Sequence, residues 1–157
     1  MLRKTIIAAV CETSPMGALV VPAEQPLRDA IASFSHEHSK HSIFLTDEAS
    51  RFVGVINNRH LLDWARLQFN VYPSDYKMSV HHVRRLLLAE SIGALARPES
   101  KKMSVRLTDS IDEALRVMTH FNLEDIAVLD NDDRIANDLR LSEVLRYALD
   151  VTEEDGQ

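Results

Sequence analysis

Hydrophobic and polar positions follow a helical period in two separate stretches of the chain. Within 27–34 and within 111–118, apolar residues recur at i, i+3, i+4 and i+7, which places them on one face of an amphipathic helix. They are Leu27, Ala30, Ile31 and Phe34 in the first stretch and Ile111, Ala114, Leu115 and Met118 in the second. The two stretches lie about 84 positions apart, which indicates an internal repeat.

The same order of shorter elements surrounds each of these helices. A short apolar run precedes the helix, two more follow it on either side of an acidic turn, and a closing helix begins near Asn58 or Ser142. Each copy has roughly 50 residues, too few for a large core of its own, whereas two packed copies can share one. The sequence therefore predicts an α/β fold of two β-α-β-β-α repeats related by a pseudo-twofold axis, with small sheets packed on helices.

This repeat divides the chain into four parts. They are an N-terminal segment with the first repeat at 1–69, a helical linker at 70–96, the second repeat at 97–150, and a frayed acidic tail at 151–157. In the linker, Ser79 is placed to cap the start of a helix. That helix is expected to reach residue 96 and to turn Val83, Leu86 and Leu87 inward.

Composition and charge limit the classes of partner. With 157 residues, 45% hydrophobic residues and a formal charge of −6, the chain is typical of a globular protein and lacks the dense basic face that nucleic acid requires. Its one cysteine, Cys11, excludes an intrachain disulfide and fits a reducing compartment. The apolar run at 5–10 is short for a secretory signal, and no run is long enough to insert into a membrane. We expect a cytoplasmic location.

Catalytic motifs are not evident in the sequence. Four glycines cannot supply a phosphate-binding loop from one segment, and no nucleophile stands in a motif with a base, so the chain is not expected to be an enzyme. The cluster of His36, His38 and His41 has two interpretations. The imidazoles could converge on a transition metal, or they could belong to a polar helix end where histidine interacts favourably with the helix dipole.

Three motifs in each copy resemble those of the cystathionine-β-synthase (CBS) domain. The helix at 110–118, the strand and acidic residue at 126–130, and the segment at 54–61 match the family pattern best. Two copies in tandem resemble the CBS pair called a Bateman module. The resemblance implies that an adenosine-containing regulatory ligand, such as AMP, ATP or S-adenosylmethionine, binds between the copies, with no cofactor required.

The resemblance also identifies four positions that would contact this ligand. In the family a hydroxyl side chain lies near phosphate, and an aspartate three residues later accepts hydrogen bonds from ribose. This sequence has Asn57 and His60 at these positions in the first copy, and Arg140 and Glu143 in the second. Arginine can grip phosphate and a carboxylate can accept from two hydroxyls, so the ligand is expected at Arg140 and Glu143.

Structural roles remain open for the same positions. Asn57 could simply cap a helix, Arg140 could be solvated, and Glu143 could interact with a helix dipole. Two functional classes therefore follow. One is a ligand-sensing regulatory module, expected to be a homodimer that acts on an effector protein. The other is a dimerisation or partner-docking module without a ligand, for example the cytoplasmic tail of a transporter.

Overall fold

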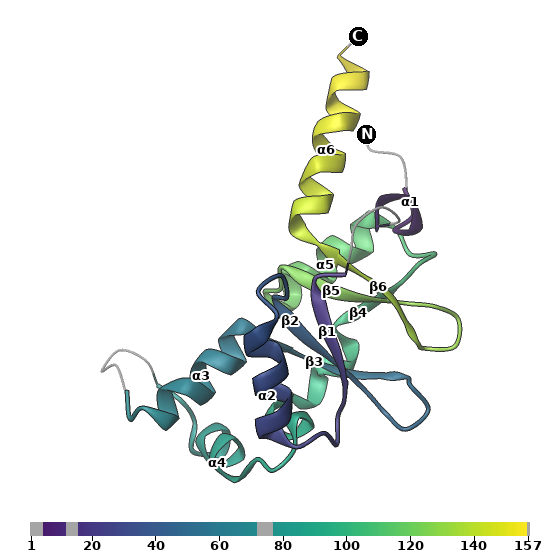
Figure 1. Cartoon of the computed structure of the whole chain (residues 1–157). Coiled ribbons are helices and arrows are strands. Elements are labelled where there is room, and N and C mark those ends of the chain that lie inside the picture. The colour runs from purple at the N-terminus through teal and green to yellow at the C-terminus, as the bar shows by residue number, and fades with distance from the viewer. Residues whose placement is uncertain (1–4, 12–15, 72–76, 157) are drawn as a thin grey trace.

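Two three-stranded sheets form the centre of the computed structural model, which describes residues 5–11, 16–71 and 77–156 (Figure 1). The first repeat supplies one sheet and the second repeat supplies the other. In chain order the elements are α1 (Ala8–Cys11), β1 (Ala18–Pro22), α2 (Leu27–His36), β2 (Ser42–Thr46), β3 (Phe52–Asn57), α3 (Asn58–Gln68), α4 (Val80–Leu88), the 3-10 helices η1 (Ile92–Leu95) and η2 (Pro98–Lys102), β4 (Ser104–Arg106), α5 (Ile111–Phe121), β5 (Asp125–Leu129), β6 (Ile135–Arg140) and α6 (Leu141–Asp155).

The two sheets have the same topology. In each, the first strand pairs with the second in parallel, and the second pairs with the third in antiparallel fashion. The register shifts once in each hairpin, between Leu45 and Thr46 and between Val128 and Leu129. The predicted α/β fold of two repeats is confirmed.

The acidic turns of the two hairpins are built in the same way. Asp47 Oδ1 accepts hydrogen bonds from the backbone N–H of Ala49 and Arg51, and Asp130 Oδ1 accepts from the corresponding groups two and four residues later. A carboxylate that bonds its own following backbone stabilises a tight turn. The backbone N–H of Phe52 also donates to the carbonyl of Asp133, so the two hairpins are joined side by side.

The core between the sheets is shared by both repeats. One buried cluster combines Phe44, Phe52 and Val55 of the first repeat with Ile126 and Val128 of the second. A second cluster combines residues of the first repeat with residues of α4 and η1 in the linker. Because a repeat of this size has little apolar surface to bury alone, the shared cluster explains why the chain needs two.

The segment before each repeat packs on the opposite repeat. Ile7, next to α1, is buried in the shared cluster, and its backbone N–H donates to Asp109 of the second repeat. Equivalently, Ile92 in η1 is buried against the first repeat and its N–H donates to Gln25. The N-terminal segment assigned to the first repeat in the sequence therefore completes the second.

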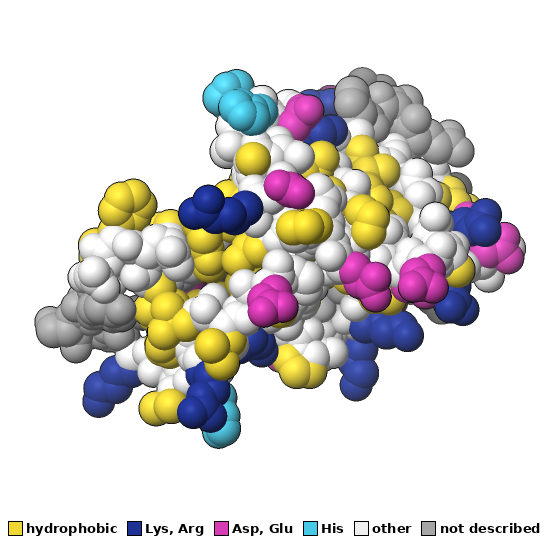
Figure 2. All heavy atoms as spheres, turned by 60° about the horizontal axis from the view of Figure 1, so that its bottom comes forward, with side chains coloured by type: hydrophobic (Ala, Val, Ile, Leu, Met, Phe, Trp, Pro, Cys, Tyr) yellow, Lys and Arg dark blue, Asp and Glu magenta, His cyan; other side chains and the backbone are white. Residues whose placement is uncertain are grey.

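Two further expectations about helices need correction. The linker helix ends at Leu88 instead of residue 96, and Leu87, expected to face inward, is 59% exposed, whereas Leu86 is buried. Figure 2 brings the bottom of Figure 1, where α4 lies, toward the viewer, and apolar side chains are exposed on this face. The tail at 151–155 is helical, because no glycine or proline interrupts α6 before Gly156, and α6 projects from the body (Figure 1).

Candidate functional site

A cavity of about 260 Å³ lies between the two repeats. The first repeat contributes the residues before β2 and at the start of α3, and the second contributes the end of α5 and the start of β5. The lining residues are His41, Ser42, Asn57, Asn58, Arg59, His60, Arg97, Met103, Phe121, Asn122, Leu123, Glu124 and Asp125. Both repeats must be in place to form the cavity, which makes it sensitive to their relative arrangement.

Asn57 and His60 are hydrogen-bonded to each other at the start of α3. The side-chain oxygen of Asn57 accepts from the backbone N–H of His60 at 3.1 Å, and His60 Nδ1 accepts from the N–H of Asn57 at 3.4 Å. This reciprocal cap satisfies two backbone donors of the first turn. The sequence interpretation of Asn57 as a helix cap is confirmed, and the cap also fixes both side chains at the edge of the cavity.

His60 presents a donor to the cavity instead of an acceptor. The side chain is 2% exposed, and burial, assisted by the positive charge of Arg97, lowers its pKa to about 4. The imidazole is therefore neutral at pH 7, and because Nδ1 accepts from Asn57, the proton is on Nε2. No described residue accepts a hydrogen bond from that Nε2–H.

The cavity has an apolar floor and a cationic side. Met103 and Leu123 are buried among its lining residues, and Phe121 is half-buried beside them. Arg59 and Arg97 supply the positive charges. An apolar surface suits a planar ring and a guanidinium suits an anion, so the cavity can hold a molecule that combines the two.

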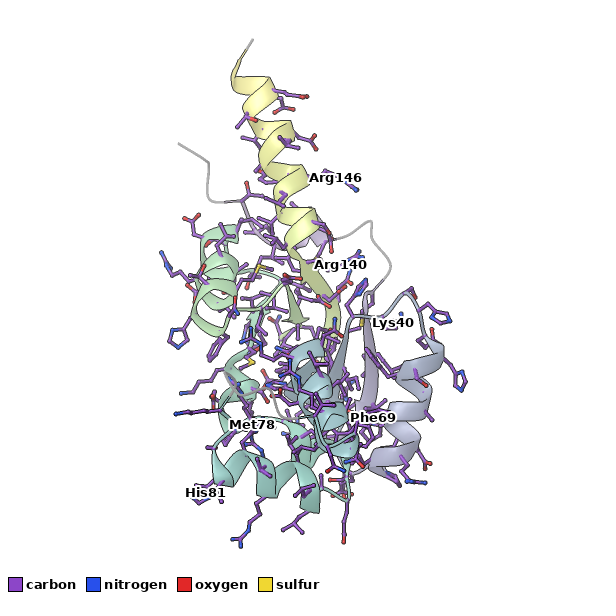
Figure 3. All side chains as sticks on the ribbon, turned by 90° about the vertical axis from the view of Figure 1, so that its left-hand side faces the viewer. Lys40, Phe69, Met78, His81, Arg140 and Arg146 are labelled. Atoms are coloured by element: carbon purple, nitrogen blue, oxygen red, sulfur yellow. The ribbon has the colours of Figure 1, made fainter. Side chains whose placement is uncertain are left out.

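Arg140 and Glu143 are paired with each other. Glu143 Oε1 lies 3.1 Å from Arg140 Nε and also accepts from the backbone N–H of Arg140. Arg140 Nε is 3.9 Å from Asp138 Oδ2, which in turn accepts from the N–H of Gly17. Figure 3 shows Arg140 at the base of α6. The two side chains contact each other as neighbours at i and i+3 in the first helical turn, and Glu143 Oε2 is buried without a partner among the described residues, so ligand binding at this pair stays a prediction.

A buried acidic pair, Asp125 and Asp138, lies at the cavity, and no motif in the sequence indicates it. Asp125 Oδ2 accepts from the hydroxyl of Ser42 of the other repeat at 2.9 Å. Burial, followed by the hydrogen bond and charge of Asp138, raises the pKa of Asp125 to about 9. Oδ1 of each aspartate lacks a partner among the described groups when both are ionised, and a proton held by Asp125 removes this deficit.

Gly54 accommodates a close approach within the protein. A Cβ added at this position would lie 2.6 Å from the Oγ of Ser100 in η2. Because Ser100 is buried against β3, its side chain cannot move away from such a Cβ. The same Oγ accepts from the N–H of Val55. The missing side chain therefore lets η2 pack on β3 and brings Arg97, the residue before η2, to the cavity.

The histidine cluster does not form a metal site in the structure. His36, His38 and His41 are exposed at the end of α2 and in the segment after it. Within 5–11, 16–71 and 77–156, no three His, Cys, Asp or Glu side chains are grouped so that they could hold a metal ion. His36 is the last residue of α2 and the other two histidines follow it, and this backbone does not bring the three side chains together.

Comparison with known proteins identifies the fold. Residues 10–66 match the family model described as the CBS domain. A CBS domain-containing protein from Thermotoga maritima has a similar structure, with a TM-score of 0.70 and 19% identity, over 92% of this chain and 94% of that one. The chain has the fold of a tandem CBS-domain pair.

Two other similar structures contain adenosine compounds. CBSX2 in complex with AMP aligns with a TM-score of 0.65 and 15% identity, over 94% of this chain and 98% of that one. The CBS domain pair of the protein MJ0100, in complex with 5′-methylthioadenosine and S-adenosyl-L-methionine, aligns with a TM-score of 0.63 and 14% identity, over 92% and 98%. No curated protein sequence matches this chain. Among the described residues, no helix has the length and apolar character needed to span a bilayer.

Proposed function

We propose that this CBS pair is a regulatory module, without catalytic activity, that binds an adenosine nucleotide in the cavity at Asn57 and His60. The observation that carries the proposal is the cavity itself, in which an apolar floor and two arginines from different parts of the chain meet between the repeats. Its volume of about 260 Å³ lies just below the usual range for small-molecule sites, which begins at about 300 Å³. Similar structures that hold AMP or S-adenosyl-L-methionine support this class of ligand.

Regulation would follow from the position of the cavity. A ligand in it contacts the start of α3 in the first repeat and the end of α5 in the second, so it favours the relative arrangement of the repeats that fits it best. An effector protein that contacts both repeats would respond to that shift.

Substitution of Arg59 by alanine should weaken binding of AMP by about tenfold, because a charge-assisted hydrogen bond to phosphate contributes roughly 1.5–3 kcal/mol in favourable geometry and less when exposed. Titration calorimetry measures the change. Arg84, an exposed arginine of α4 outside the cavity lining, is the matched control, and Arg84→Ala should bind AMP like the wild type.

The same titration distinguishes the cavity at Asn57 and His60 from the pair of Arg140 and Glu143 as the binding site. Glu143→Ala should alter AMP affinity by less than about twofold, because its carboxylate is engaged by Arg140. A tenfold loss in Glu143→Ala, together with none in Arg59→Ala, would place the ligand at the site first expected from the sequence. Failure of the wild type to bind AMP, ATP or S-adenosylmethionine would contradict the proposed ligand class.

A homodimer remains a prediction, and α6 offers a surface for it. Leu141, Leu145 and Leu149 recur every four residues along the helix and are exposed. An apolar stripe on a projecting helix is typical of an association surface. Light scattering at micromolar concentration should report twice the monomer mass, and Leu145→Asp should report the monomer mass. A monomeric wild type would contradict this prediction.

A further inference from the structure

A second cavity, of about 430 Å³, opens beside the first. Arg59, Arg97, Phe121 and Asn122 line both cavities, so the two spaces are adjacent. The residues that line only the second are Glu99, Lys102 and His120. A ligand seated in the first cavity therefore has room to extend toward η2 and the end of α5.

The second cavity is cationic although the whole chain is acidic. Arg59, Arg97 and Lys102 face one carboxylate, Glu99, in a chain whose formal charge is −6. Among the described residues, no ion pair joins any of these three cations to a carboxylate. Three cations against one carboxylate leave this hollow with an excess of positive charge, which attracts an anion of high charge.

We propose that the ligand is a nucleoside di- or triphosphate whose outer phosphates lie in this second cavity, against Lys102. The inference rests on the proposed function and specifies the ligand class of the same site. The base occupies the apolar floor at Met103 and Leu123, and the first phosphate lies between Arg59 and Arg97, which line both spaces. Each additional phosphate then extends outward toward Lys102.

The same charges disfavour other adenosine compounds. Nucleosides have no anion to place beside the two arginines, and S-adenosylmethionine carries a sulfonium cation that they would repel. A monophosphate reaches the charges shared by the two cavities and leaves Lys102 without a partner. Lys102 is therefore the residue that discriminates by phosphate number.

Titration calorimetry with adenosine, AMP, ADP and ATP, without divalent metal, tests this assignment. We expect affinity to rise along that series, with ATP about tenfold tighter than AMP, and to fall at high salt. Lys102→Ala should weaken ATP binding by about three- to tenfold and AMP binding by less than about twofold. Lys101, its exposed neighbour, lines neither cavity, so Lys101→Ala should keep the wild-type preference.

The outcomes separate the two proposals. If AMP and ATP bind equally and Lys102→Ala affects both alike, the polyphosphate assignment is overturned while nucleotide binding stands. If Lys101→Ala reduces the ATP preference as much as Lys102→Ala does, the effect is a general one of surface charge and the assignment is also overturned. If none of the four compounds binds, the proposed function itself fails.

Discussion

Replacing Asp125 by asparagine is expected to stabilise the protein above neutral pH and to remove most of the pH dependence of its stability. Burial and Asp138 raise the pKa of Asp125 from 3.8 to about 9 in the folded state. Between these two values the folded protein holds a proton that the unfolded chain has lost. The free energy of unfolding therefore falls as pH rises through this range, by at most about 1.4 kcal/mol for each pH unit.

Asparagine keeps the contacts of the protonated acid without its titration. Its amide N–H can donate to Asp138 and its oxygen can accept from the hydroxyl of Ser42, the contacts that Asp125 makes now. The charge of Arg140 also acts on Asp125, and the substitution leaves the ion pair of Arg140 with Glu143 intact. The substitution is therefore expected to remove the titration of this one side chain and to leave the surrounding contacts unchanged.

Urea denaturation at pH 5, 7 and 9 measures the effect. The wild type should lose stability over this series, whereas Asp125→Asn should lose much less and should be the more stable protein at pH 9. Asp132, an exposed aspartate in the second acidic turn, provides the control, and Asp132→Asn should retain the wild-type slope. Parallel slopes for the wild type and Asp125→Asn would show that Asp125 is ionised in the folded state.

The repeat could be predicted from the sequence because its signals are local. Two apolar stripes of helical period and two acidic turns depend on residues within about ten positions of each other. The exchange of segments between the repeats could not be predicted. The four residues of α1 are too few to show a hydrophobic period, and their position depends on where Ile7 finds apolar surface. Only the folded chain shows that Ile7 and Ile92 complete opposite repeats.

The candidate site was predicted in part for the same reason. Asn57 and His60 could be identified because they occupy motif positions, but Arg97, Met103 and Phe121 come from the other repeat, and their meeting depends on how the repeats pack. The pairing of Arg140 with Glu143 did have a sequence signal. Opposite charges three residues apart at the start of a helix are neighbours, so each is the other's nearest partner.

Truncation of Phe44 should have the largest effect on stability. Phe44 is 0% exposed, packs edge-to-face on Phe52 at 6.2 Å, and belongs to the cluster shared with Ile126 and Val128 of the second repeat. Phe44→Ala should lower the free energy of unfolding by about 3–5 kcal/mol, the usual loss for a buried aromatic ring. Phe69, at the end of α3, is 79% exposed, and Phe69→Ala should change stability by less than about 0.5 kcal/mol.

Because Phe44 lies between the repeats, its loss should destabilise both together. Trp64, the one tryptophan, reports on α3 of the first repeat, whereas circular dichroism reports on all helices. In Phe44→Ala, the midpoints of the unfolding transitions followed by the two signals should fall to the same lower urea concentration. In Phe44→Leu, which keeps more of the apolar volume, both midpoints should fall by less. Separate transitions, with tryptophan fluorescence changing first, would show that the second repeat is stable without the first. The cavity between them would then depend on docking of two independent units rather than on one cooperative fold.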